Sequence, residues 1–396
     1  MKPAWHIVEF QGREGLLRLE ADWKRLLAAM PDRGAHHTYE SHVAYFDHLS
    51  DAAGRYTCLA LSDGDRIRAI CPLEIRTAKI LGRRTRVWDL PWDLENLLRD
   101  VICPPGDARA ELLPRVLQFL RRAPERPALL LLGRVLQTSA AWECLRSLDA
   151  RAYCADSVEG SAQFDCSGPF EELALKLSRK FRSNLRNAHR KLAAMREVRF
   201  VTAGDPSTLV SEFERFLDLE AAGWKGQSGS RTAIRMRPEV EGFFRALTAM
   251  TGADSRCEIN ALYAEGECIA SLFCIRAGAE CAAFKIAYDE RLAAVAPGHL
   301  LLEWTVQQCC RSPEIKRLNM VSNAEWLGVW RPDVVPVHCV YIGLGRWAGP
   351  LQVKLLRMRF RHGPRIKRWL LQWGRAAGVS VRSRGGPGGS STSGEG

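Results

Sequence analysis

The chain runs twice through a similar order of strand-like and helix-like segments, and this alternation limits the folds open to it. Each pass opens on a short run of alternating apolar residues, continues through amphipathic helices and ends in further strands. The first pass covers residues 1–150 and the second covers residues 151–346. This mixed order predicts an α/β (α+β) fold of two related halves. Each half should contain a mixed, mostly antiparallel twisted sheet flanked by helices.

Periodicity and turn signals place the individual elements. In the first half we expect strands at 5–10, 57–61, 68–76 and 128–132, and helices at 13–30, 40–49, 108–122 and 140–148. In the second half we expect strands at 163–166, 198–203, 258–264, 267–276, 280–288, 317–321 and 337–344, and helices at 169–195, 206–222, 238–250 and 298–310. Asp63-Gly64 predicts a hairpin between two of the strands.

Two further segments follow the second half. Residues 347–382 mix Lys and Arg with Leu, Phe and Trp, which predicts basic C-terminal helices. Such helices can pack on the preceding domain or lie on an anionic membrane surface, and the sequence leaves both open. Residues 383–396 are mostly Gly and Ser, so we expect a disordered tail.

Composition narrows the class of protein. The 396 residues, 46% of them hydrophobic, can bury a sizeable core. No apolar run reaches the roughly 18 residues of a membrane span, and the N-terminus lacks a signal-peptide pattern. We therefore expect a cytoplasmic protein, with contact to the inner face of the membrane left open. The net charge of +12 favours anionic partners. The 13 cysteines lack metal or disulfide spacing, which predicts reduced thiols and no metal.

The segment 281–304 carries the strongest chemical signal. An alternating strand ends at Tyr288-Asp289, and Pro297-Gly298 opens an apolar helix after a short loop. Free backbone N–H groups and the positive end of the helix dipole would face an incoming anion there. Gly298 would allow a ligand close to the backbone. The predicted cofactor-binding residues are Ala296, Pro297, Gly298, His299 and Leu300.

Two other stretches fit an anionic ligand. A helix over 177–192 carries one apolar stripe and one arginine stripe that includes Arg182. The second stretch is Glu220 followed by Trp224-Lys225. Glutamate and tryptophan four residues apart share a helix face, which suits a carboxylate held beside a flat wall.

These three stretches together resemble the CelD-like acetyltransferases of the GNAT superfamily, which are associated with cellulose and exopolysaccharide synthesis. In that family a Lys-x-x-Tyr-Asp strand precedes Ser/Ala-Pro-Gly-x-Leu-Leu, and here Lys285-Ile-Ala-Tyr288-Asp289 precedes Ala296-Pro297-Gly298-His299-Leu300-Leu301. The family's Glu-x-x-x-Trp-Lys element corresponds to Glu220–Lys225. The resemblance covers about 171–321. It implies two GNAT-like halves, with acetyl-CoA or another acyl-CoA bound as co-substrate in the second.

The resemblance also implies roles in acyl transfer to an amine or hydroxyl acceptor, such as an amino sugar or another cell-envelope or exopolysaccharide precursor. Transfer needs a base for the acceptor and stabilisation of the thioester oxygen. Glu220 and Asp289 are the candidate bases, followed by His299 and Glu303, and Tyr288 could protonate the departing thiolate. The predicted substrate-binding residues are Arg182, Trp224, Lys225 and Lys285.

Two rival interpretations stay open. Paired GNAT-like halves also occur in FemABX peptidyltransferases, whose donor is aminoacyl-tRNA; otherwise we expect no nucleic acid partner. The second rival is a non-catalytic protein of the same fold that binds a membrane surface or another anion through its C-terminal helices. The acyl group, the acceptor, the pathway and the oligomeric state are not determined by the sequence.

Overall fold

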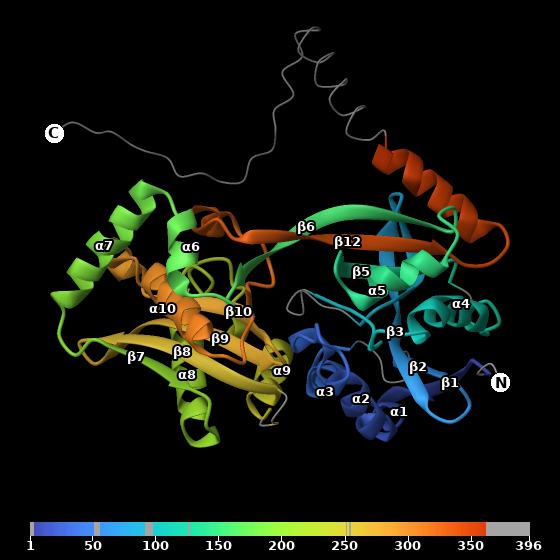
Figure 1. Cartoon of the computed structure of the whole chain (residues 1–396), viewed down its shortest axis with the longest axis horizontal. Coiled ribbons are helices and arrows are strands. Elements are labelled where there is room, and N and C mark those ends of the chain that lie inside the picture. The colour runs from blue at the N-terminus through green and yellow to red at the C-terminus, as the bar shows by residue number, and fades with distance from the viewer. Residues whose placement is uncertain are drawn as a thin grey trace, which may run out of the picture.

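A twelve-stranded sheet runs through the part of the chain that the structure describes (Figure 1). The computed structural model describes residues 4–50, 56–91, 98–125, 127–250, 252 and 255–361. Its strand order is β1-β2-β3-β4-β5-β12-β6-β11-β10-β9-β8-β7. The strands are β1 His6–Gln11, β2 Tyr56–Ser62, β3 Ile67–Ile80, β4 Arg83–Asp89, β5 Leu129–Leu136, β6 Tyr153–Asp165, β7 Arg199–Ala203, β8 Ser255–Ala264, β9 Glu267–Ala277, β10 Glu280–Tyr288, β11 Arg317–Asn319 and β12 Asp333–Gly343.

Helices cover both faces of this sheet. The α-helices are α1 Gly12–Arg18, α2 Glu20–Ala28, α3 Tyr39–His48, α4 Ala108–Leu120, α5 Ala140–Cys144, α6 Phe170–Lys176, α7 Arg179–Ala193, α8 Pro206–Ala222, α9 Pro238–Thr248 and α10 Pro297–Arg311. Short 3₁₀ helices are η1 Ala35–His37, η2 Leu145–Ser147, η3 Ile234–Met236, η4 Glu290–Val295 and η5 Glu325–Trp330. The described chain ends in a helix over 348–361, called the C-terminal helix below. No helix within the described residues combines the length and hydropathy of a membrane span.

The predicted mixed, mostly antiparallel fold is confirmed, and the two halves share one sheet. Each half contains one short parallel pair, β4 with β5 and β10 with β11, among antiparallel neighbours. The halves are joined by β12, which pairs with β5 on one side and with β6 on the other. Because β12 belongs to the second half in sequence but extends the first half's sheet, the two halves are interlocked. The division at residue 150 stays a prediction.

Successive side chains of the central strands point to opposite faces of the sheet, so the core lies in two layers, one on each face. Leu130 and Leu132 of β5 face one cluster, to which α1–α5, α8 and α9 contribute. Leu129 and Leu131 face the other side, which the C-terminal helix covers. In the second half α6, α7 and α10 cover that same side. In Figure 1, α6, α7 and the C-terminal helix accordingly lie above the sheet, and α1–α3, α8 and α9 lie below it.

The structure differs from the predicted elements at several points. The helix predicted at 169–195 is broken at Leu177-Ser178, where the Ser178 hydroxyl accepts the Phe181 N–H and caps α7. The helix predicted at 13–30 is likewise two helices. The strand predicted at 163–166 is the end of the much longer β6, and β4 was not predicted. Of the predicted C-terminal segments, 362–382 and the tail 383–396 lie outside the described residues.

Two buried histidines make the stability depend on pH. His36 and His42 are almost fully buried, and desolvation lowers the pKa of His36 far below its usual value and the pKa of His42 to about 3. The unfolded chain therefore binds more protons than the folded chain below about pH 6.5, so stability falls as pH falls. We expect His42→Gln to reduce this slope by about 1.4 kcal/mol per pH unit between roughly pH 6 and 4. Urea unfolding of both proteins across this range measures it, and parallel stability curves would contradict it.

Candidate active site

The β10–β11 pair opens into a wedge soon after it begins. Three residues of β10, Glu280 to Ala282, pair with β11, whereas pairing with β9 on the other side continues to Tyr288. A register shift between Ala283 and Lys285 marks a bulge at the point where the two strands separate. Beyond it, within the described residues, this edge of β10 has no partner strand. A ligand with amide groups of its own can therefore add to this edge as a further strand would.

The loop after β10 turns the chain sharply back into α10. Asp289 begins this loop, and its carboxylate accepts the Arg291 backbone N–H and forms a two-pronged contact with the Arg291 guanidinium. Ala296 then adopts the left-handed conformation, with φ of 52°. For a residue other than glycine, the left-handed conformation costs about 1–2 kcal/mol. Ala296 directly precedes Pro297, the first residue of α10, so the turn sets the helix start against the end of β10.

Most of the backbone amides in this turn are already bonded. The N–H groups of His299 and Leu300 both donate to the Ala296 carbonyl, and Pro297 has no N–H. Gly298 is the amide of this first turn that has no acceptor among the described residues. The cradle of several free amides expected from the sequence is therefore reduced to one amide and the helix dipole.

A cavity of ≈ 440 Å³ fills the wedge, and we call it the β10 pocket. The lining comes from the end of β10, from η4 and the start of α10, from η5 and from the loop after α8. Its lining residues are Trp224, Lys225, Ile286, Tyr288, Ala293, Ala296, Pro297, Gly298, His299 and Trp326. The pocket thus unites four of the five predicted cofactor-binding residues with three aromatic rings. Leu300, the fifth, is buried in the core beneath the pocket.

Gly298 has the space for hydrogen and little more. A Cβ placed there would lie 3.3 Å from Cδ1 of Tyr288 and 3.7 Å from Cδ1 of Ile286. Its φ is not in the left-handed region, so the requirement for glycine comes from packing and not from backbone conformation. A larger side chain would have to enter the pocket or displace the Tyr288 ring.

His299 is held in one tautomer by a tryptophan. Trp330 donates its indole Nε1–H to His299 Nδ1 at 3.0 Å. An indole nitrogen can only donate, so Nδ1 must accept, and in the neutral ring the proton lies on Nε2. Burial lowers the pKa of His299, which favours that neutral form. The ring packs edge-on against Phe181 and Trp326. The Nδ1 lone pair of His299 is therefore occupied by the Trp330 indole, and the ring carries its proton on Nε2.

Glu220 was predicted as a base, but both of its carboxylate oxygens already accept hydrogen bonds from the protein. It is buried, its Oε1 accepts from Lys225 Nζ at 3.1 Å, and its Oε2 accepts the Ile234 backbone N–H at 2.8 Å. Lys225 also lies over the Trp224 ring, 5.8 Å from the centroid. Glu220 thus anchors the loop that carries Trp224 and Lys225. It lines a small hollow beside the β10 pocket and not the pocket itself.

A second, more polar cavity of ≈ 650 Å³ adjoins the β10 pocket, and we call it the polar pocket. Tyr288 lines both cavities. Asp289 lies in the polar pocket, where the Arg291 guanidinium lowers the pKa of its carboxyl. Glu290 accepts the Trp224 backbone N–H at 2.9 Å and so joins η4 to the Trp224 loop. The remaining charged residues in its lining are Arg215, Asp218, Glu267 and Arg291.

The other predicted residues lie outside the β10 pocket. Arg182 is half-buried on α7, and Lys285 is half-buried at the β10 bulge. Glu303 accepts from His189 at 2.6 Å and thereby ties α10 to α7. Trp326 and Trp330, which shape the pocket and orient His299, were not predicted. The available signal was two tryptophans four residues apart after a short strand.

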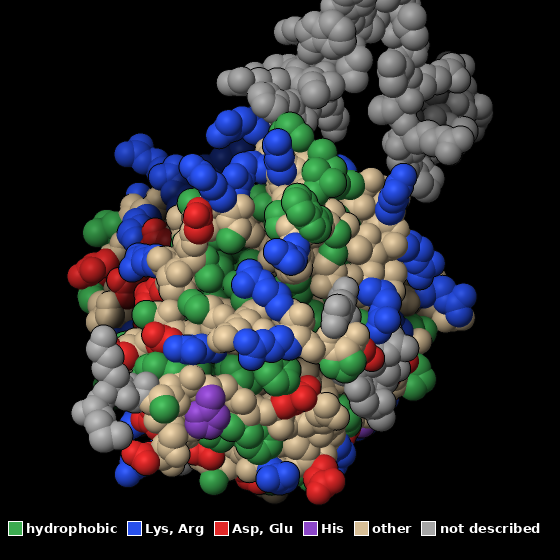
Figure 2. All heavy atoms as spheres, turned by 90° about the vertical axis from the view of Figure 1, so that its right-hand side faces the viewer, with side chains coloured by type: hydrophobic (Ala, Val, Ile, Leu, Met, Phe, Trp, Pro, Cys, Tyr) green, Lys and Arg blue, Asp and Glu red, His purple; other side chains and the backbone are tan. Residues whose placement is uncertain are grey.

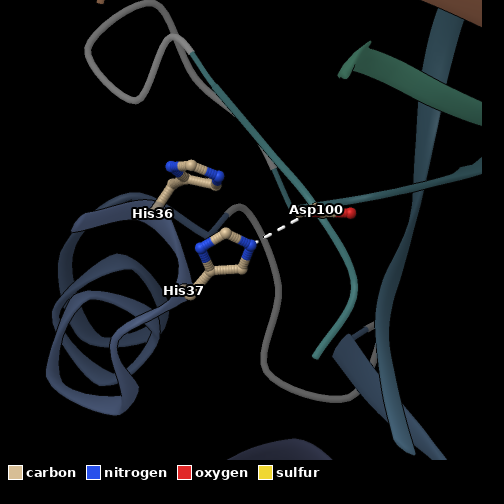
Figure 3. Close-up of side chains that lie close together, drawn as sticks. All are labelled: His36, His37 and Asp100. Carbon is tan, nitrogen blue, oxygen red and sulfur yellow. Dashed lines mark hydrogen bonds and ion pairs between the residues drawn. The ribbon is translucent and has the colours of Figure 1, made fainter. Parts of the chain in front are cut away.

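A buried histidine–aspartate cluster lies in the first half, and hydrogen bonds account for it (Figure 3). Gly34 donates its N–H to His37 Nδ1, so His37 carries its proton on Nε2 and donates it to Asp100 at 3.1 Å. Asp100 also accepts the backbone N–H groups of Val101, Ala140 and Ala141. Both ring nitrogens of His37 are thus engaged in hydrogen bonds, and the third member of the cluster, His36, packs on the His37 ring with 4.0 Å between the centroids. It connects η1 to the start of α5.

Comparisons with known proteins agree with this geometry. Residues 179–325 match the model of the acetyltransferase (GNAT) domain family. FemX is similar at 10% identity, with a TM-score of 0.53, over 82% of this chain and 96% of that one. A conserved protein of unknown function from Bacteroides thetaiotaomicron is similar at 15% identity, with a TM-score of 0.52, over 82% and 97%. No curated protein sequence matches the chain.

At these identities the two solved structures establish a shared fold and nothing finer. The matched segment contains the Trp224 loop, β10, η4 and α10, and with them every lining residue of the β10 pocket except Trp326. Residues 179–325 are thus similar to the acetyltransferase (GNAT) domain family, and this match supports an acyltransferase.

Proposed function

We propose that the chain transfers an acyl group from acetyl-CoA or another acyl-CoA to an amine or hydroxyl acceptor. The observation that carries this proposal is the wedge between β10 and η5, which is open, largely apolar and floored by the start of a helix. The extended pantetheine arm of CoA has amide groups that can pair with the free edge of β10. The CoA phosphates would lie toward the Gly298 amide and the positive end of α10.

The side chains of the pocket supply what the reaction needs. The acceptor's lone pair attacks the thioester carbon, the C–S bond breaks, and the acceptor's proton ends on the departing sulfur. His299 Nε2–H would donate to the carbonyl oxygen as negative charge develops on it. Tyr288, between the two pockets, would donate its phenolic proton to the sulfur. The polar pocket would hold the acceptor, and Asp289 or Glu290 would take the acceptor's proton, directly or through water, and then return it to the Tyr288 phenolate, so that both groups regain their starting states.

The resemblance to CelD-like acetyltransferases supports an amino sugar or another cell-envelope or exopolysaccharide precursor as the acceptor. The polar pocket suits such a molecule, because its paired acidic and basic side chains can bond hydroxyl and amino groups. We place the reaction in the cytoplasm, where acyl-CoA is made.

Calorimetric titration of the full chain with acetyl-CoA, longer acyl-CoAs and free CoA tests the donor. We expect saturable binding of one thioester per chain and, by mass spectrometry, an acylated product with amino sugars. Absence of binding to every thioester, together with binding of aminoacyl-tRNA, would replace this proposal with the FemABX-like one.

The Trp330→Phe variant tests whether the Trp330 indole fixes the tautomer of His299. The change keeps an aromatic ring but removes the N–H that fixes His299 Nδ1, so both tautomers and the protonated ring become accessible. We expect the turnover rate to fall by about 3–10-fold, the value of one hydrogen bond. Initial rates at a fixed pH measure this change, and a wild-type rate in a normally folded Trp330→Phe variant would contradict the assigned tautomer.

A further inference from the structure

The C-terminal helix presents an apolar stripe to solvent on the side opposite its packed side. Its inner residues Val353, Leu356 and Phe360 pack on the sheet beside Ile80 and Val87 of the β3–β4 hairpin. Gly349 fits so closely that a Cβ there would meet the carbonyl oxygens of Leu344 and Ala128. The C-terminal helix is thus closely packed on the sheet, and this packing determines which of its faces points to solvent.

Four large apolar side chains occupy this outer face. Trp347 is 84% exposed, Leu351 57%, Met358 45% and Leu355 39%. At 100° per residue these positions fall within an arc of about 80°, opposite to the inner residues. Single exposed apolar residues are common on proteins, but a continuous stripe of this kind marks an interaction surface. We call it the outer stripe.

Basic side chains flank the outer stripe. Residues 346–361 contain five basic residues and no acidic residue: Arg346, Lys354, Arg357, Arg359 and Arg361. Arg357 is engaged with the carbonyls of Ala150 and Tyr153, and Arg359 lies near Asp156. The others have no acidic partner among the described residues. Figure 2 shows hydrophobic side chains gathered along the upper edge of this end of the molecule, with Lys and Arg beside them.

The neighbouring hairpin adds more positive charge. The exposed Lys79, Arg83 and Arg84 lie at the tip of the β3–β4 hairpin. Ile80, Leu81 and Val87 of the same hairpin belong to the cluster that seats the C-terminal helix. The tip therefore adjoins the helix, and the two elements form one basic surface with an apolar ridge.

From this arrangement we propose that the outer stripe and the hairpin tip dock the protein on an anionic phospholipid bilayer. A water-soluble protein partner could match the apolar stripe without the basic residues that border the stripe on both sides. A bilayer with acidic headgroups supplies both components, since Trp, Leu and Met side chains enter the interfacial region while Lys and Arg meet the phosphates. The α7 helix, also strongly basic, covers the same face of the sheet. The proposal does not depend on the identity of the acyl donor.

Vesicle co-sedimentation of the full chain tests the proposal. We expect binding to vesicles of phosphatidylcholine and phosphatidylglycerol at 3:1, little binding to pure phosphatidylcholine, and weakening as salt is raised, because salt screens the phosphates. Trp347→Gln with Leu351→Gln should lower the partition coefficient about tenfold or more. Arg83→Glu with Arg84→Glu should weaken binding to the anionic vesicles only. The matched control is Val210→Gln, an exposed apolar residue on α8 at the opposite face, which should bind as wild type does.

Several results would overturn the proposal. One is equal binding to neutral and anionic vesicles. Another is unchanged binding of the Trp347/Leu351 double variant when its thermal unfolding matches wild type, since membrane contact would then lie elsewhere. If that variant instead changed the sedimentation coefficient without lipid, the stripe would belong to a contact between two copies of the chain.

Discussion

Gly298→Glu is expected to weaken acyl-CoA binding by at least about 100-fold, close to 2.7 kcal/mol. The new Cβ would lie 3.3 Å from the Tyr288 ring, so the side chain must extend into the β10 pocket. Its carboxylate would then occupy the space proposed for the pantetheine arm and repel the CoA phosphates. Calorimetric titration with acetyl-CoA measures the loss.

Two further variants distinguish a side chain that fills the β10 pocket from a substitution that disturbs the fold. Gly328→Glu adds the same charge on the exposed η5 turn, where a Cβ would meet nothing within 4 Å, and should bind acyl-CoA within a few-fold of wild type. Gly298→Ala needs the Tyr288 ring to move only a few tenths of an ångström, so its effect should be intermediate. Wild-type affinity in Gly298→Glu would show that the donor does not lie against α10.

His299→Ala is expected to lower the turnover rate by about 10²–10³-fold, the usual effect of removing one donor to a developing oxyanion. Acyl-CoA affinity should change far less, because the donor matters most when charge builds on the oxygen. Single-turnover rates at saturating donor measure the chemical step. Equal losses in affinity and rate would contradict this role and indicate a binding residue.

His299→Gln distinguishes a donor from a base. A glutamine amide can donate a hydrogen bond from a similar position but cannot accept a proton at neutral pH. We expect this variant to keep its rate within about tenfold of wild type, well above that of the alanine variant. If glutamine were as inactive as alanine while both folded normally, His299 would be acting as a base, and the tautomer set by Trp330 would not describe the working enzyme.

The sequence predicted best what depends on local pattern. The β10 strand and the α8 helix are found at their predicted bounds. For α8 the reason is burial of one face, which gives its hydrophobic residues a helical period. The Pro297-Gly298 helix start was visible for the same reason. The break before α7 carried a local signal as well, because Ser178 is a good N-cap, but the continuous apolar stripe on either side of it suggested one helix.

What the sequence could not show depends on contacts between distant segments. The first part of β6, residues 153–162, is polar and small in composition, and it is a strand because it pairs with β12. The left-handed conformation of Ala296 produces no periodic pattern in the sequence, and neither does the hydrogen bond from Trp330 to His299. Glu220 was predicted as a base from its spacing to Trp224, whereas its actual partners, Lys225 and Ile234, are determined by how the loop folds.

If the wedge at the end of β10 receives the acyl carrier, a crystal structure with a non-hydrolysable acyl-CoA analogue will show it there. We expect the pantetheine arm between β10 and η5, with the thioester carbonyl within hydrogen-bond distance of His299 Nε2 and the phosphates near Gly298. An analogue bound elsewhere, with the β10 pocket unoccupied, would contradict it.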